Sequence, residues 1–278
     1  MYHLKKFNVT SGKYRKLFSS VAKVIDVSTD DKTNITRVYL QRPPVNSLNS
    51  HLLTEISYIM DDLEKTKCKG LVLTSNIVNI FSAGLDLTEF YKTDIQKLSN
   101  FWTTLQNTWL KLYTATFPTV ALINGHSPAA GCLLALSCDY RIMLSPHYTI
   151  GFNEAKIGIP APFWFIEVMQ SIIGSRKTEL SVLTGQMYKT DEALAIGLID
   201  ETAINLTEAE SKVNSFFKNI IAFPGKSRSL MKKDCRDHIV QKFLLKKDEE
   251  RELVIEFIMN PKTQKNIELY FKALQNKV

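Results

Sequence analysis

Two short apolar runs, each followed within a few residues by a segment of small residues, most constrain what this chain can fold into. The runs are residues 70–74 and 119–123, and the segments after them read FSAGLDL at 81–87 and NGHSPAAGC at 124–132. A short continuous apolar run bounded by turn residues is typical of a buried strand. Small residues at a strand end let a ligand approach the backbone closely. The pattern therefore predicts two loops whose backbone N–H groups together bind an anionic oxygen.

A lone acid, Glu154, follows these two segments on a predicted loop. Its flanks are apolar, and burial among apolar side chains raises the pKa of a carboxyl group toward neutrality. The flanking residues are Ile150, Phe152, Ile157 and Ile159. An oxyanion hole with one carboxylate suits proton transfer beside a carbonyl group. Two interpretations stay open from these residues alone, a catalytic base or the solvated acid that most glutamates are.

Strand and helix patterns alternate along the chain and predict an α/β architecture of packed layers. The predicted strands are residues 21–27, 36–41, 70–74, 119–123 and 139–144. The predicted helices are one capped by Asn49 or Ser50, one capped by Thr207, and residues 94–113, 129–136, 163–173, 176–183, 190–196, 232–259 and 261–274. Residues 52, 56, 59 and 63 form one apolar helical stripe, which predicts that this face is buried.

Charge and composition divide the chain and exclude some functions. Residues 1–22 are basic and free of acids, which is typical of a mitochondrial transit peptide; a merely basic terminus is the alternative. Beyond residue 25 there are 29 basic and 28 acidic residues, a balance that argues against nucleic-acid binding. No apolar run approaches the ~20 residues that span a bilayer. The four cysteines lack metal-ligand spacing, so no metal site is predicted.

Three segments, 81–87, 125–139 and 151–160, resemble the signature regions of the crotonase (enoyl-CoA hydratase/isomerase) superfamily, and the resemblance extends over residues 22–275. The runs PPVNSL at 43–48 and APFW at 161–164 are similar to its Δ3,Δ2-enoyl-CoA isomerase branch. The resemblance implies a spiral core of ββα turns at 23–200 and a C-terminal helical region at 201–278 that assembles homotrimers. It also implies a fatty acyl-CoA substrate, no cofactor apart from the CoA of that substrate, and a place in β-oxidation in the mitochondrial matrix.

By this resemblance, the backbone N–H groups of Ala83 and Ala130 bind the thioester oxygen, and Glu154 moves one proton to convert 3-enoyl-CoA into trans-2-enoyl-CoA. The family often has glycine where Ala130 stands, so alanine is tolerated there only if φ is negative. Leu133 occupies the position of a hydratase's second glutamate, which favours isomerisation over hydration. The alternatives are another crotonase reaction, either hydration or thioester hydrolysis, and an inactive acyl-CoA-binding scaffold.

The remaining residues of these segments are predicted to contact the substrate. They are Ser82, Gly84, Leu85, Asp86, Leu87, Leu133 and Asn153. For Asp86 and Asn153 a turn-stabilising role is an equal alternative. Phe163 and Trp164 are candidates either for an acyl pocket or for the core.

Overall fold

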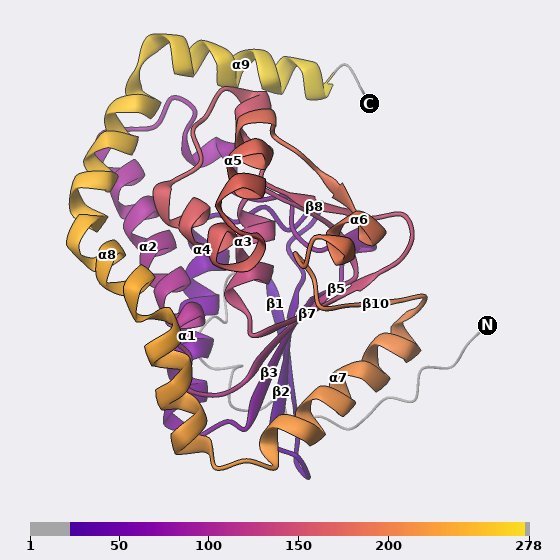
Figure 1. Cartoon of the computed structure of the whole chain (residues 1–278). Helices are drawn as coiled ribbons and strands as arrows, with labels where there is room; N and C mark the ends of the chain where they lie inside the picture. The colour runs from indigo at the N-terminus through magenta and orange to yellow at the C-terminus, as the bar shows by residue number, and fades with distance from the viewer. Residues whose placement is uncertain (1–22, 276–278) are drawn as a thin grey trace.

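The computed structural model describes residues 23–275, and the predicted leader at 1–22 lies outside them. A six-stranded sheet forms the centre of the molecule (Figure 1). Its strands, in spatial order, are β1 (Ile25–Asp30), β2 (Ile35–Leu40), β3 (Gly70–Ser75), β5 (Thr119–Ile123), β7 (Tyr140–Leu144) and β10 (Glu201–Ala203). The β1–β2 pair is antiparallel, and every other pair in this sheet is parallel.

A second, smaller sheet contains the strands that follow β3, β5 and β7 in the chain. Its order is β4 (Asn79–Ile80), β6 (Gly125–Pro128), β8 (Thr149–Gly151) and β9 (Tyr188–Lys189). The chain passes from β3 to β4, from β5 to β6 and from β7 to β8, with helical segments between these passes. This winding is the predicted spiral of ββα turns, and it places the loops after three parallel strands at the same edge.

Helices cover both sides of the central sheet. In Figure 1, α1, α2 and α8 lie together on one side and α7 lies on the other, with α9 across one end. The helices are α1 (Ser50–Lys65), α2 (Ile95–Tyr113), α3 (Ala130–Ser137), α4 (Phe163–Ile173), α5 (Ser175–Thr184), α6 (Thr190–Ala195), α7 (Leu206–Ile221), α8 (Gly225–Met259) and α9 (Pro261–Gln275). Short 3-10 turns occur at η2 (Leu87–Glu89) and η3 (Glu154–Ile157).

Local sequence signals explain most helix boundaries. The Asn49 side chain accepts a hydrogen bond from Leu52 N at 2.9 Å, so the predicted cap of α1 is confirmed. The predicted Thr207 cap of α7 is wrong. Asn205 caps that helix by accepting from Glu208 N at 2.9 Å, and the Glu208 carboxylate accepts from Ile204 N. Asn205 precedes the first helical turn, where the N–H groups need an acceptor.

Two other elements differ from the prediction by more than two residues. Strand β1 continues to Asp30 through polar residues because all of its residues pair with β2, from Ile25 opposite Leu40 to Asp30 opposite Ile35. Helix α8 begins at Gly225, seven residues before the predicted 232. The prediction missed these residues because the first turns of the helix lack an apolar stripe. The division of the described chain at residue 200 stays a prediction.

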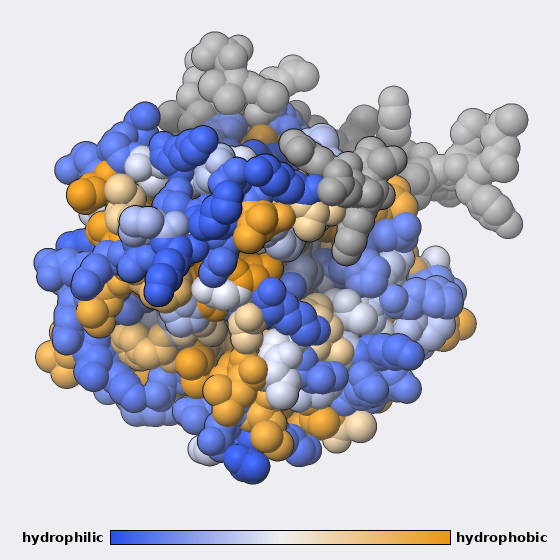
Figure 2. All heavy atoms as spheres, turned by 90° about the horizontal axis from the view of Figure 1, so that it is seen from above, coloured by the Kyte–Doolittle hydropathy of each residue, from blue (hydrophilic) through white to orange (hydrophobic). Residues whose placement is uncertain are grey.

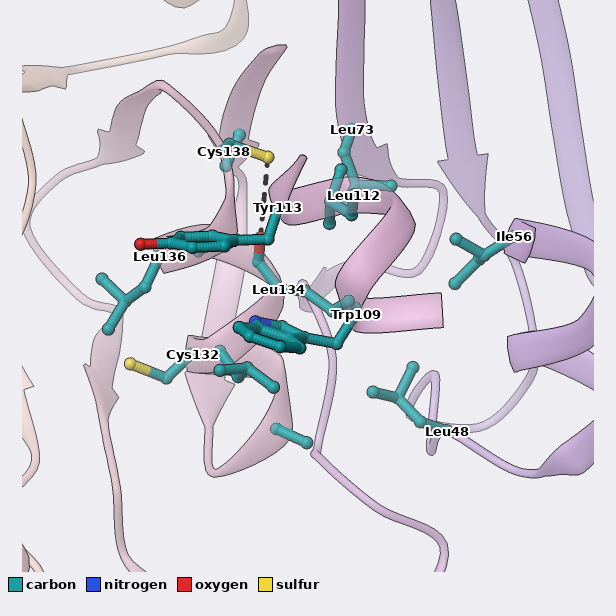
Figure 3. Packing of buried hydrophobic residues seen from close by; sticks show 14 of the residues in the cluster. Leu48, Ile56, Leu73, Trp109, Leu112, Tyr113, Cys132, Leu134, Leu136 and Cys138 are labelled. Atoms are coloured by element: carbon teal, nitrogen blue, oxygen red, sulfur yellow. Dashed lines mark hydrogen bonds between the residues drawn. The ribbon is translucent and has the colours of Figure 1, made fainter. Parts of the chain in front are cut away.

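The main core lies between the central sheet and the helices. Helix α3 is buried over all eight of its residues, which explains why its sequence is apolar all round. Trp109 of α2 packs at the centre of this core, close to side chains of α3 (Figure 3). Its ring stacks on that of Tyr113 with centroids 5.1 Å apart. A rigid, closely packed helix therefore stands behind the loop that follows β6.

The surface mixes hydrophilic and hydrophobic side chains. On the face that Figure 2 shows from above, hydrophobic patches lie between hydrophilic side chains. In the described part of the chain, no helix is long and apolar enough to cross a membrane.

Candidate active site

The two small-residue loops predicted from the sequence lie against each other. A Cβ atom built on Gly131 would lie 2.4 Å from Ser82 O, and one on Gly84 would lie 2.9 Å from Ala129 Cβ. Gly84 also has φ +89°, a backbone conformation that residues other than glycine rarely adopt. Glycine at these two positions is therefore what lets the loop after β4 approach the start of α3.

The loop after β4 is fixed from behind by a buried asparagine. Asn46 Nδ2 donates to Ser75 Oγ at 2.7 Å and to Phe81 O at 3.0 Å. The Ser82 hydroxyl donates to Asn46 O at 2.8 Å. The predicted contact between Ser82 and substrate is therefore not supported, because the protein itself uses this hydroxyl.

The prediction that Ala83 supplies an oxyanion donor is wrong. Its N–H donates to Val45 O at 3.0 Å, so it points into the neighbouring loop and is already satisfied. The donor that this loop offers is Leu85. Leu48 N donates to Gly84 O at 2.8 Å and Leu48 O accepts from Asp86 N at 3.1 Å, so the N–H of Leu85 faces the opposite side.

Within residues 23–275, the Leu85 N–H has no backbone or side-chain acceptor. The second predicted donor, Ala130, is the first residue of α3, and the first N–H groups of a helix lack intrahelical acceptors. The N atom of Ala130 would lie 3.3 Å from a Cβ on Gly84, the residue before Leu85. The N–H groups of Leu85 and Ala130, both without acceptors, thus come from a loop and a helix start that lie against each other.

Alanine is tolerated at position 130 because its backbone is helical. The positive φ falls one residue earlier, at Ala129, where φ is 52° and ψ is −127°. The Ala129 N–H donates to Gly151 O at 2.8 Å, which anchors this conformation to β8. A non-glycine residue in such a region stores about 1–3 kcal/mol of strain and persists only where its surroundings hold it.

Glu154 is the first residue of η3, and its side chain is buried. It is 8% exposed, and its Oε2 atom has no hydrogen-bond partner among the described residues. Burial raises the pKa of this carboxyl group from 4.5 to about 7. Glu154 is therefore not the solvated loop acid of the alternative interpretation, and it can both accept and release a proton near neutral pH.

Glu154 and Leu85 both line a cavity of about 690 Å³. Its surface is mostly apolar and comes from the loop with Leu85, the residue after η2, α2, η3, the segment leading into α4, and α8. The other lining residues are Phe90, Trp102, Ile159, Pro160, Ala161, Pro162, Phe163, Lys242, Lys246, Glu249, Glu250, Leu253, Val254, Glu256, Phe257, Ile258 and Asn260. A cavity of this size with a mostly apolar surface suits a small-molecule ligand.

The other predicted contact residues do not line the cavity. Asp86 caps η2 by accepting from Thr88 N at 3.1 Å, and its second oxygen pairs with Arg42 at 2.8 Å, so the turn-stabilising interpretation holds. None of Ser82, Gly84, Leu87, Leu133 and Asn153 lines the cavity, and Leu133 is 1% exposed in the core. Phe163 lines the cavity, whereas Trp164 is fully buried in the core.

Sequence reasoning missed the wall that α2 and α8 supply, above all Trp102 and Glu250. Trp102 falls within the predicted helix 94–113 among other apolar residues that pack in the core, and Glu250 stands among charged residues where nothing in the sequence marks it as buried. Only packing of α8 against α2 reveals them. In the described part of the chain, no group of three or more His, Cys, Asp or Glu residues could hold a metal ion.

The fold and the site define a class of protein that comparison with known proteins confirms. A family model described as enoyl-CoA hydratase/isomerase matches residues 30–276. The chain therefore belongs to the enoyl-CoA hydratase/isomerase family, and it is an enzyme of that family. It is 38% identical over 253 residues to enoyl-CoA delta isomerase 1, mitochondrial, of Mus musculus, with 90% of this chain and 87% of the relative covered.

A crystal structure of human mitochondrial delta3-delta2-enoyl-CoA isomerase superposes with a TM-score of 0.89 at 33% identity, covering 92% of this chain and 99% of that one. Relatives with another activity are more distant. A short-chain-enoyl-CoA hydratase of Clostridium acetobutylicum is 28% identical and covers 63% of this chain and 68% of its own length. The more extensive similarities are thus to isomerases of the family.

Proposed function

We propose that this enzyme converts 3-enoyl-CoA into trans-2-enoyl-CoA by a proton shift from C2 to C4. Removal of the C2 proton forms an enolate whose negative charge lies on the thioester oxygen. The N–H groups of Leu85 and Ala130 bind that oxygen, and the dipole of α3 adds positive potential at Ala130. Glu154 accepts the C2 proton and returns it at C4, so the enzyme ends in its starting state.

The observation that carries this proposal is Glu154, a buried carboxyl group with a pKa of about 7 in the same apolar cavity as Leu85. A base works best when its pKa lies near the working pH. Leu133, at the second turn of α3, is apolar and 1% exposed, so this helix provides no acid that could activate water. This supports isomerisation over hydration.

The test is conversion of 3-hexenoyl-CoA to 2-hexenoyl-CoA by the purified protein. We expect Glu154→Gln to lower kcat by at least about 100-fold, the size of effect typical of a general base. Glu252→Gln, on an exposed residue of α8 outside the cavity, is the matched control and should keep full activity. Full activity of Glu154→Gln would disprove the assignment of the base.

Three other results would replace the proposal. Addition of water to crotonyl-CoA, without isomer conversion, would identify a hydratase, and thioester hydrolysis would identify another reaction of the family. Binding of acyl-CoA without any turnover would identify a scaffold.

The setting we propose is β-oxidation of unsaturated fatty acids in the mitochondrial matrix, with no cofactor apart from the CoA of the substrate. The mitochondrial names of the mammalian relatives support the compartment. We also propose a homotrimer. Exposed apolar side chains on α8, such as Leu245 at 85% exposure and Leu253 at 58%, support association with further copies.

A further inference from the structure

One side chain of α9, Gln264, connects two walls of the cavity. Its Nε2 group donates to Phe90 O at 2.9 Å and to Ile258 O at 2.8 Å. Phe90 directly follows η2 and Ile258 lies in the last turn of α8. Both residues line the cavity together with Leu85 and Glu154. A single NH2 group thus holds together the backbones of two cavity walls that are distant in the chain.

The oxygen of the same amide holds a third residue. Gln264 Oε1 accepts from Lys92 N at 2.9 Å. Lys92 has φ 51°, in the left-handed region, and a residue other than glycine keeps this conformation only where its surroundings hold it. The short segment from Phe90 to Lys92 is therefore fixed at both of its ends by one side chain of α9.

The neighbours of the two walls show what the amide contributes. The Phe90 ring is held by α2, where it packs edge-on against Phe101 with ring centroids 5.5 Å apart. Ile258 is 1% exposed and belongs to the last turn of α8, where carbonyl groups lack donors from within the helix. Gln264 supplies such a donor and ties the end of α8 to the segment that α2 holds. The separation of the Phe90 and Ile258 walls therefore depends on Gln264.

We propose that Gln264 is a positioning residue, which holds the Phe90 and Ile258 walls at the separation at which long acyl chains bind. This inference rests on the proposed function of the cavity. Each methylene group that leaves water for an apolar wall strengthens binding about fourfold. A gap of about 0.5–1 Å already loses about a quarter to a half of the van der Waals attraction across it. Without the amide, long chains lose more binding than short chains, which reach less of the wall.

The first test compares 3-hexenoyl-CoA with 3-dodecenoyl-CoA in the unmodified enzyme and in Gln264→Met, which keeps a similar length but removes the amide. We expect KM for 3-dodecenoyl-CoA to rise about tenfold in the variant, with kcat within about twofold. KM for 3-hexenoyl-CoA should change by less than about threefold. Loss of folded enzyme alone would instead lower the apparent kcat for both substrates and leave both KM values unchanged. An unchanged KM for 3-dodecenoyl-CoA would overturn the proposal.

Arg228→Met is the matched control. Arg228 Nη1 donates to Ile220 O at 2.7 Å and to Phe223 O at 3.4 Å, so this side chain also ties two carbonyl groups at one end of α8. Arg228 does not line the cavity. We expect both KM values to stay unchanged in this variant. An equal rise of KM for 3-dodecenoyl-CoA in the two variants would disprove a specific role of Gln264, because general loosening of α8 would then explain the effect.

A second exchange, Gln264→Glu, tests which hydrogen bonds of the amide matter. At about pH 8 the introduced carboxylate is ionised, so it accepts from Lys92 N but cannot donate to Phe90 O or Ile258 O. We expect this variant to raise KM for 3-dodecenoyl-CoA as Gln264→Met does. A KM equal to that of the unmodified enzyme would show that the two wall contacts do not position the chain. If Gln264→Met does not fold, this exchange decides.

A binding measurement distinguishes failure of this inference from failure of the proposed function. Hexanoyl-CoA and dodecanoyl-CoA, which have no double bond to move, are compared by calorimetry in the unmodified enzyme and in Gln264→Met. Suppose that no 3-enoyl-CoA is isomerised, but the variant binds dodecanoyl-CoA about tenfold more weakly and hexanoyl-CoA almost equally. The reaction is then wrong and the assignment of Gln264 stands. If isomerisation occurs and the variant binds both ligands like the unmodified enzyme, the reaction stands and the assignment of Gln264 is wrong.

Discussion

At the scale of single residues, the raised pKa of Glu154 predicts that activity depends on pH. In the proposed reaction the carboxylate must be ionised to accept the C2 proton, and burial raises its pKa from 4.5 to about 7. We therefore expect kcat/KM for 3-hexenoyl-CoA to rise about tenfold per pH unit below pH 7 and to level off above it. A profile that is already flat at about pH 5 would contradict the assignment.

The same shift makes the folded protein less stable at high pH. Between the unfolded pKa of 4.5 and the folded pKa of about 7, the folded state holds more protons than the unfolded state, so stability falls as pH rises through this window. The loss amounts to about 3 kcal/mol once the carboxyl group is ionised in both states. Glu154→Gln removes this loss. Between about pH 5 and about pH 8, the free energy of unfolding measured with urea should therefore rise in the variant relative to the unmodified enzyme.

At the scale of elements, the start of α3 and the loop after β4 must stay in close contact. Gly131→Ala would place a Cβ atom 2.4 Å from Ser82 O, which forces the two elements apart. We expect this variant to lose about 1–3 kcal/mol of stability and to lose activity by more than stability explains, because the Leu85 and Ala130 donors separate. Urea unfolding and kcat, measured below the unfolding midpoint, check this.

The control for this exchange is Gly225→Ala at the start of α8. There a Cβ atom would lie 3.5 Å from the nearest neighbouring atom, an ordinary contact. Normal activity in Gly225→Ala and in Gly131→Ala alike would show that the contact does not position the donors.

The same elements show what the sequence could predict. Strands and helices with strong apolar periodicity were predicted almost to the residue, as with β5 and α4. The two loops and Glu154 were also found, because small residues after a buried strand and an acid among apolar residues are local signals. The Leu85 donor in the first loop was not found, because its identity depends on which N–H groups of that loop pair with Leu48 and which face away from it. The α8 wall was missed because it depends on packing between distant segments.

At the scale of the whole molecule, one acid joins α8 to the central sheet. Asp139 pairs with Lys232 and with Arg236, each at 2.9 Å, and accepts from Thr119 N at 2.9 Å. Removing its charge leaves two largely buried cations unpaired. We expect Asp139→Asn to lower the free energy of unfolding by about 3 kcal/mol or more. Urea denaturation measures this.

An exposed ion pair supplies the comparison. Arg176 and Glu179 lie 2.8 Å apart on α5, with side chains 73% and 55% exposed. Glu179→Gln should leave the unfolding midpoint unchanged within error, because solvent screens such pairs. Equal losses in the two variants would mean that Asp139 acts as an ordinary surface acid.

The long helix α8 also sets the order in which a newly made chain becomes able to work. Leu85, Ala130 and Glu154 have all left the ribosome well before α8, whose residues between Lys242 and Ile258 supply one wall of the cavity that Leu85 and Glu154 line. Until those residues emerge, the apolar lining stays open to water and to the chaperones that bind exposed apolar chain. A message cut short before α8 would thus encode every group that we propose for catalysis and still give no enclosed place for an acyl chain.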